Sequence, residues 1–267
     1  MDVSTIAGLA IGLVILVLAL ILGHVPIETL LSPEAIIVVF GGTLTATLVS
    51  FDASTLRSAW RAMQDAFTDN RMSTAQHVNY VMDVARFVRA EGILALQTLL
   101  PGIELPYLRK GLSLVVDNRP EQFVRESLST EAEVIYREEL DHARVFETAG
   151  GFAPTMGIIG AVIGLIYVVQ SFDDPKTLGQ GVASAFSATL YGVAIANLFL
   201  LPIAGKLKQR AREHWFHHAL MLEAITSIHR EEHPLVLEEK IEAFLIREKQ
   251  DIPKATQHRD DYQAIGI

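Results

Sequence analysis

The 267-residue sequence contains no cysteine, so disulfide bonds and thiolate chemistry are excluded. It also lacks a serine elbow, a His-Glu-x-x-His motif, a phosphate-binding loop and a recognisable pair of catalytic carboxylates. We therefore expect no enzymatic activity, no resident cofactor and no metal site. The formal net charge of −9 also argues against nucleic-acid binding, because phosphate backbones are bound by basic surfaces.

Charge is missing from four long apolar runs. They are Val3–Gly23, Ala35–Phe51, Ala149–Phe172 and Gly181–Gly205. Roughly 20 apolar residues in a helix cross the hydrocarbon core of a bilayer, so the runs predict four transmembrane helices. The second run is the shortest and contains two adjacent glycines. The alternative interpretation of this run is a buried helix of a soluble domain. The first is too long for a signal-peptide core, and we expect it to be retained as an anchor.

The basic residues predict the orientation of these helices. Of the 22 Lys and Arg residues, 11 lie between Asp52 and Thr148, 10 follow Gly205, and the remaining one is Lys176. Cytoplasmic segments next to membrane spans carry the excess of Lys and Arg. We therefore expect both charged segments and both termini in the cytoplasm.

The sequence thus predicts an all-α integral membrane protein in four parts. Residues 1–51 would form transmembrane helices 1 and 2, residues 52–148 a cytoplasmic helical domain, residues 149–205 transmembrane helices 3 and 4, and residues 206–267 a cytoplasmic C-terminal helical extension. Apolar residues recur at helical spacing between 52 and 148, which favours at least four helices there. Ser73 with Gln76 resembles a capping box, and Gly92 is expected to end a helix.

The third run carries a stripe of small residues. Gly157, Gly160 and Gly164 lie three and four residues apart, which puts them on one face of a helix. Small residues allow helix backbones to approach closely in lipid. This stripe favours either tight packing within the subunit or a position lining a path, and the pattern alone leaves both open.

The runs offer hydroxyl and amide groups but no titratable group near their centres. An ion-conducting pathway usually contains a charged or titratable group at that depth, so a partner would have to supply it. For any single hydroxyl, a hydrogen bond to its own helix backbone is the simpler interpretation. Thr189 is the strongest exception, because Ser184, Ser187 and Tyr191 lie close to it in sequence. The triplet of His214, His217 and His218 has no carboxylate at ligand spacing, and we do not interpret it as a metal site.

Several segments of the sequence are similar to a known protein family. The segments Gly151–Leu165, Phe172–Lys176, Ala188–Asn197 and Leu201–Ala204 strongly resemble the MotA/PomA family of flagellar stator A subunits, which is related to the TolQ and ExbB proton channels. Phe87–Leu96 in the predicted cytoplasmic domain resembles the same family. The resemblance covers nearly the whole chain.

The resemblance implies a role in an ion-driven motor of the bacterial inner membrane. In that family, five A subunits surround two copies of a MotB-like B subunit, whose membrane helix carries the ion-binding aspartate. The family's functional prolines in the third and fourth spans correspond here to Pro154 and Pro202, and its pore-facing threonine corresponds to Thr189. We expect Ala161 and Tyr191 to belong to the same ion path. Sodium-type members typically have a threonine where this chain has Ala161, so we expect the transported ion to be a proton, with sodium as the alternative.

The resemblance also implies contact with the rotor protein FliG. The rotor-facing charged pair of the family corresponds to Arg89 and Gln97, so the acidic member is an amide here. Glu91 or Glu104 could replace it. Two other functions are considered: an ion-channel subunit of the ExbB/TolQ type, which energises outer-membrane transport and usually has three spans, and a passive membrane scaffold.

Overall fold

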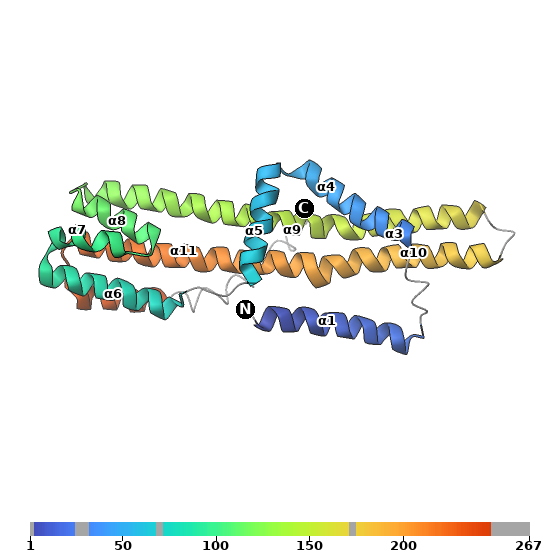
Figure 1. Ribbon diagram of the computed structural model, residues 1–267, viewed down its shortest axis with the longest axis horizontal. Coiled ribbons are helices and arrows are strands. Elements are labelled where there is room, and N and C mark those ends of the chain that lie inside the picture. Colours follow the sequence, from blue (N-terminus) through green and yellow to red (C-terminus); the bar gives the residue numbers. More distant parts are fainter. Residues whose placement is uncertain (1–2, 25–31, 68–71, 171–174, 247–267) are drawn as a thin grey trace, which may run out of the picture. The chain divides into compact units, whose positions relative to one another are not determined.

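The structure, a computed structural model, describes residues 3–24, 32–67, 72–170 and 175–246. All regular elements in these ranges are helices, which confirms the predicted all-helical class (Figure 1). The sequence also predicts a polar turn at Asp173–Lys176 and a polar tail from Gln250. The tail and the turn residues Asp173 and Asp174 lie outside the described residues. Pro175, assigned from the sequence to that turn, is instead the first residue of a helix, where its fixed φ and missing N–H are tolerated.

The elements follow one another along the chain with short connections. They are α1 (Val3–Leu22), α3 (Pro33–Ile36), the π-helical turn η1 (Ile37–Gly41), α4 (Gly42–Ser50), α5 (Ala53–Phe67), α6 (Thr74–Glu91), the 3-10 turn η2 (Ile93–Ala95), α7 (Leu96–Leu99), the 3-10 turn η3 (Leu100–Gly102), α8 (Pro106–Val116), α9 (Glu121–Gln170), α10 (Pro175–Ile195), the π-helical turn η4 (Ala196–Leu200) and α11 (Leu201–His229). Residues 234–246 form a further helix.

Three of the described helical segments are long and apolar enough to cross a membrane. They are Pro33–Ser50, Glu121–Gln170 and Leu178–His229, and they overlap the second, third and fourth runs predicted from the sequence. The first run forms the 20-residue helix α1, in which Ala10–Leu22 is a shorter apolar segment. Four spans therefore remain a prediction, with length and composition supporting three of them.

Local sequence signals account for several helix ends. The Ser73 side chain accepts from the N–H of Gln76, and the Gln76 side chain accepts from the N–H of Ser73, so the predicted capping box begins α6. Gly92 ends α6 with φ of +86°, a conformation that a Cβ would strain. At the start of the second span, the Ser32 hydroxyl accepts from the N–H of Ala35.

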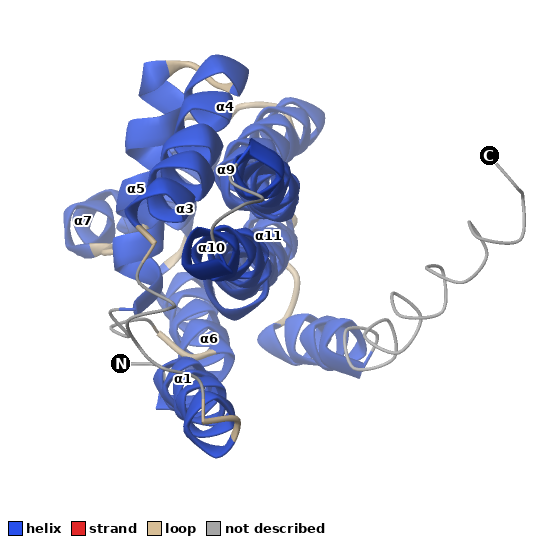
Figure 2. Ribbon diagram, turned by 90° about the vertical axis from the view of Figure 1, so that its right-hand side faces the viewer, coloured by secondary structure: helices blue, strands red, loops and turns tan. Residues whose placement is uncertain are grey.

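The chain divides into two compact units, the first comprising residues 1–70 and 137–212. In this unit α5 packs against the middle of α9 and the beginning of α11 through a cluster of buried apolar residues. The cluster consists of Ala59, Ala66, Ala143, Val145, Phe146, Ala204 and Leu207. The α10 helix and the C-terminal part of α9 lie side by side in both views (Figures 1 and 2).

The second unit comprises residues 71–136 and 213–267. Its core is formed by α6, α8, the N-terminal part of α9, the C-terminal part of α11 and the helix at 234–246. Leu96, Leu108, Leu112, Leu128 and Leu220 are completely buried there. The sequence predicted two separate parts for residues 52–148 and 206–267. In the structure, the apolar faces of residues 213–246 complete the core that residues 71–136 form.

Candidate functional site

The α9 and α10 helices approach each other most closely at the predicted glycine stripe. A Cβ placed on Gly157 would lie 2.9 Å from the carbonyl oxygen of Ala188, and one on Gly160 would lie 2.7 Å from the Cβ of Ala188. A Cβ on Gly164 would lie 3.0 Å from the backbone nitrogen of Ala185. Atoms this close leave no room for a side chain, so glycine at these positions permits the observed helix spacing.

The α10 helix contributes small residues of its own to this contact. Gly181, Ala185, Ala188 and Gly192 face α9, and a Cβ on Gly192 would clash with the carbonyl oxygen of Ala153. The second span packs nearby, because a Cβ on Gly42 would lie 2.7 Å from the Sδ of Met156. The stripe therefore serves close packing of helices within one subunit.

Thr189 and Tyr191 occupy different environments on α10. The Thr189 hydroxyl donates a 3.3 Å hydrogen bond to the carbonyl of Ala185, while the residue itself is exposed in the single chain. Its oxygen can still accept a hydrogen bond from outside the subunit. Tyr191 is half-buried and packs against the apolar cluster of Ala35, Val39 and Ala188. The structure thus leaves Thr189 available to a ligand or partner and gives Tyr191 a packing role.

The two prolines implied by the resemblance interrupt the third and fourth spans. Pro154 is half-buried inside α9, and its missing N–H removes the usual donor to the carbonyl of Gly150. Pro202 is exposed at the second position of α11, the helix that directly follows the π-helical turn η4. Single π-helical turns inside α-helices occur frequently at functional sites. Sequence reasoning gave no signal for η4 or for η1 in the second span.

Ala161 is half-buried on α9, between Gly160 and Gly164. No Asp, Glu, Lys, Arg or His occurs between Ala149 and Gln170 or between Gly181 and Gly205. Among the described residues, no group of His, Cys, Asp and Glu is arranged to hold a metal ion. An ion that passes along these helices would therefore need a charged group from another chain.

The residues predicted to contact a rotor protein lie in the second unit. Arg89 is in the last turn of α6, Glu91 is its last residue, Gln97 belongs to α7, and Glu104 lies between η3 and α8. All four are exposed. Arg89 donates a long hydrogen bond of 3.4 Å to the carbonyl oxygen of Glu231, a residue that the sequence did not single out.

The segment after α11 is attached to the core by ion pairs. The Nζ of Lys240 lies 2.6 Å from a carboxylate oxygen of Glu232 and 3.1 Å from one of Glu223. Arg230 pairs with Glu121 at 2.5 Å and with Glu232 at 3.7 Å. The hydrogen bond from Arg230 lowers the pKa of Glu121, and the hydrogen bond from Lys240 lowers the pKa of Glu232. Partial burial opposes the charge on Lys240, but the bonds to Glu232 and Glu223 outweigh it and raise its pKa.

The histidines of α11 take part in ring contacts. The rings of His217 and His77 stack with centroids 4.1 Å apart, and His217 also shares a 3.1 Å hydrogen bond with the hydroxyl of Thr74. The ring of His218 stacks on Tyr107, whose hydroxyl donates to the carbonyl of Leu128 at 3.0 Å. These contacts join α11 to α6 and α8.

Comparison with known proteins places this arrangement in a family. A model of the MotA/TolQ/ExbB proton channel family matches residues 101–219, which include the whole α9–α10 contact. Motility protein A of Helicobacter pylori (strain ATCC 700392 / 26695) is 30% identical over 243 residues, covering 90% of this chain and 94% of that protein. Motility protein A of Bacillus subtilis (strain 168) is 29% identical over 246 residues, covering 92% and 91%.

A solved structure shows the same fold. The chain superposes on a chain of the flagellar MotAB stator complex from Bacillus subtilis with a TM-score of 0.82 and 27% sequence identity. The match covers 90% of this chain and 95% of that one. Together with the relatives that match over more than nine-tenths of their length, this shows that the chain belongs to the MotA/PomA family of flagellar stator proteins.

Proposed function

We propose that this chain is the A subunit of a flagellar stator, which with a MotB-like partner conducts protons and converts the proton-motive force into torque on the rotor protein FliG. The observation that carries the proposal is the α9–α10 pair. Its helices are uncharged in the predicted membrane spans, pack closely at Gly157, Gly160 and Gly164, and leave Thr189 exposed in the single chain. Such a surface suits a partner that brings the titratable group.

In the proposed complex, five copies of this chain surround two copies of the B subunit. Each chain would cross the inner membrane four times, with both termini in the cytoplasm. Residues 52–148 and 206–267 would then be cytoplasmic. The excess of Lys and Arg in these two segments supports this orientation.

The ion step would depend on a carboxylate of the B subunit that faces α10. Protonation removes its charge and lowers the cost of placing it against an apolar helix surface. Thr189 would supply a hydrogen-bonding group beside it, while Ala161 would offer no hydroxyl ligand for sodium. Pro154 and Pro202, which interrupt the regular hydrogen bonding of the third and fourth spans, would let these helices adjust as the carboxylate changes its charge.

Torque would be transmitted by charges of the second unit. Arg89 and Glu91 are exposed in the last turn of α6, and Gln97 and Glu104 are exposed on the segment that follows it. Exposed charges steer association and set specificity more than they add affinity, which suits contacts that form and break at each step of rotation.

The test is rotation of a stator-deleted strain that carries this chain and its cognate B subunit. Tethered-cell speed is measured while external sodium varies at fixed pH, and then while pH varies at fixed sodium. Speed that follows pH and ignores sodium would support the proton-driven stator. Speed that follows sodium would retain the motor and overturn the choice of ion.

The rival function is an ion-channel subunit of the ExbB/TolQ type, which the matching family model also covers. The full-length similarity to proteins named Motility protein A favours the stator. Membrane insertion of both subunits without any rotation would favour the rival.

A further inference from the structure

The α11 helix ends in a turn that places a glutamate in a strained conformation. The N–H of Glu231 donates to the carbonyl of Ile228, and the N–H of Glu232 donates to that of Ser227, both at 3.0 Å, which is the pattern of a Schellman motif. Glu231 has φ of +53°, at the position where glycine is usual because it has no Cβ. A side chain kept at such a position suggests a use for it.

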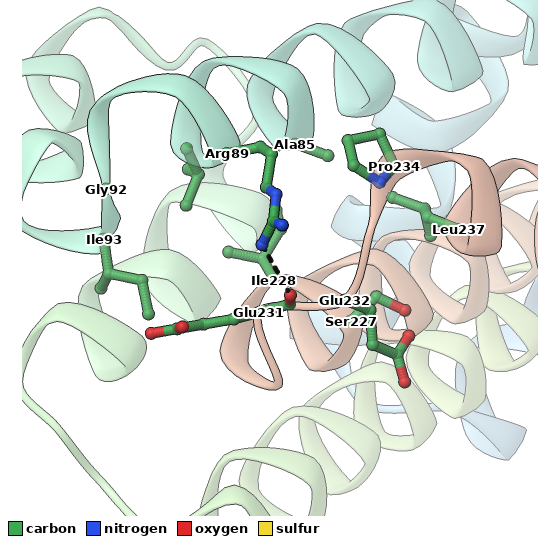
Figure 3. Close-up of a pocket in the computed structure, with 11 residues that line it drawn as sticks. Ala85, Arg89, Gly92, Ile93, Ser227, Ile228, Glu231, Glu232, Pro234 and Leu237 are labelled. Carbon is green, nitrogen blue, oxygen red and sulfur yellow. Dashed lines mark hydrogen bonds between the residues drawn. The ribbon is translucent and has the colours of Figure 1, made fainter.

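Glu231 lies on the rim of a hollow that also contains Arg89. The hollow encloses about 130 Å³ and is lined by Ala85, Val88, Arg89, Gly92, Ile93, Ser227, Ile228, Glu231, Glu232, Pro234 and Leu237. Figure 3 shows the Arg89 guanidinium reaching the Glu231 carbonyl, while the Glu231 side chain extends toward Ile93. The lining of the hollow is therefore mixed, with apolar side chains beside Ser227 and Glu232 and with a cation and an anion on its rim.

Neither rim charge is neutralised by an ion pair within the part of the chain that the structure describes. Arg89 contacts only a carbonyl, at the long distance of 3.4 Å, and Glu231 contributes its backbone to that contact. The adjacent Glu232 differs, because Lys240 and Arg230 pair with it. The carboxylate of Glu231 and the guanidinium of Arg89 are thus both available to an external protein.

We propose that Glu231 supplies the acidic half of the rotor-binding charge pair, with Arg89 as the basic half. A helix of the rotor protein that carries one acidic and one basic residue would dock over the hollow, with its acidic residue at Arg89 and its basic residue at Glu231. This inference rests on the proposed stator function. Glu91, Gln97 and Glu104 do not line the hollow, so Glu231 is the acid best placed to act together with Arg89.

The experiment replaces Glu231 in the full chain, expressed with its B subunit in the stator-deleted strain. Glu231→Gln removes the charge and keeps a side chain at the strained backbone position. Glu231→Gly removes the charge and the backbone strain together. Both variants are expected to lower tethered-cell speed roughly two- to fivefold, the range of an exposed charge contact. Glu231→Gly is also expected to match or exceed the thermal stability of the unchanged complex. A merely structural role would predict normal speed for this more stable variant.

Three further comparisons complete the test. Glu126→Gln, which changes an exposed glutamate of α9 outside the hollow, should leave speed unchanged. Glu231→Lys should lower speed further, and reversing one basic residue of the rotor protein to glutamate should restore it. Proton flux through the complex should remain unchanged in every Glu231 variant.

The outcomes separate the two proposals. Loss of speed in Arg89→Glu but normal speed in all Glu231 variants would overturn the role of Glu231 and leave the stator function intact. Failure of the unchanged chain to rotate the motor with its B subunit would overturn the stator function itself.

Discussion

The guanidinium of Arg210 donates a 2.6 Å hydrogen bond to the carbonyl oxygen of Asp65, and its other terminal nitrogen donates to the carbonyl of Ala66. Both carbonyls belong to the last turn of α5, where a helix has no backbone donors left for them. A buried cation at this end also interacts favourably with the helix dipole. Arg210 therefore caps α5 and attaches it to α11.

Replacing Arg210 by glutamine should destabilise the first unit. The loss of two hydrogen bonds from a charged donor to buried carbonyls is expected to cost about 1–3 kcal/mol. The measurement is the thermal unfolding midpoint of the purified membrane complex. Arg212→Gln, which removes the same charge from an exposed position two residues later, is the control and should leave the midpoint unchanged. Equal midpoints for both variants would contradict the capping role.

Gly157→Ala should disrupt the α9–α10 contact. The added Cβ would lie 2.9 Å from the carbonyl oxygen of Ala188, and backbone atoms cannot rotate away as a flexible side chain can. Overpacking of this kind typically costs about 1–3 kcal/mol. We expect lower stability and reduced ion flux.

The matched control for Gly157→Ala is Gly151→Ala on the same helix. A Cβ on Gly151 would meet no atom within 4 Å, so this variant should keep or slightly raise stability, because alanine favours a helix by about 0.5–1 kcal/mol. If the two substitutions had the same effect, close packing at Gly157 would not be the cause.

Pro154→Ala should abolish or strongly reduce torque while the complex still assembles. Alanine supplies an N–H that can bond the carbonyl of Gly150, so α9 would become straighter and stiffer at this point. Rotation speed and proton flux would be measured together with the amount of complex in the membrane. Thr155→Ala is the control, because the Thr155 hydroxyl only donates to the Phe152 carbonyl of its own helix, at 2.7 Å. Full torque in Pro154→Ala would refute the role assigned to this proline.

Acid should loosen the helix at 234–246. The pKa values of Glu121 and Glu232 are lowered by their hydrogen bonds to Arg230 and Lys240. A carboxyl group whose pKa is lowered by folding stabilises the folded protein at pH values above its ordinary pKa of 4.5. This stabilisation is lost as the pH falls through the lowered pKa. Amide exchange in this helix, corrected for its intrinsic pH dependence, should lose protection between neutral and strongly acidic pH.

Lys240→Gln provides the comparison for this pH effect. It removes the cation that pairs with Glu223 and Glu232, so protection at neutral pH should already be reduced and its dependence on acid should be weaker. An unchanged pH profile in this variant would show that other groups govern the stability of the helix.

The sequence predicted those features that depend on neighbours along one helix. The capping box of Ser73 and Gln76, the helix end at Gly92 and the alignment of Gly157 with Gly160 and Gly164 follow from residue spacing and backbone preference. The π-helical turns η1 and η4 were not predicted, because their apolar residues suit an α-helix equally well. The contact of Arg89 with Glu231 was also missed, since 142 positions separate the two residues.

The sequence by itself determined that the chain is helical and that its long apolar runs carry no charged side chain. From this it predicts that a titratable group in an ion path along these runs comes from a partner. Composition and helical periodicity are local properties, so they need no knowledge of the fold. Only the tertiary structure decided which helices share a core and which exposed charges become neighbours. Residues 213–246 join residues 71–136 because their apolar faces bury each other, and this packing brings the strained Glu231 beside Arg89.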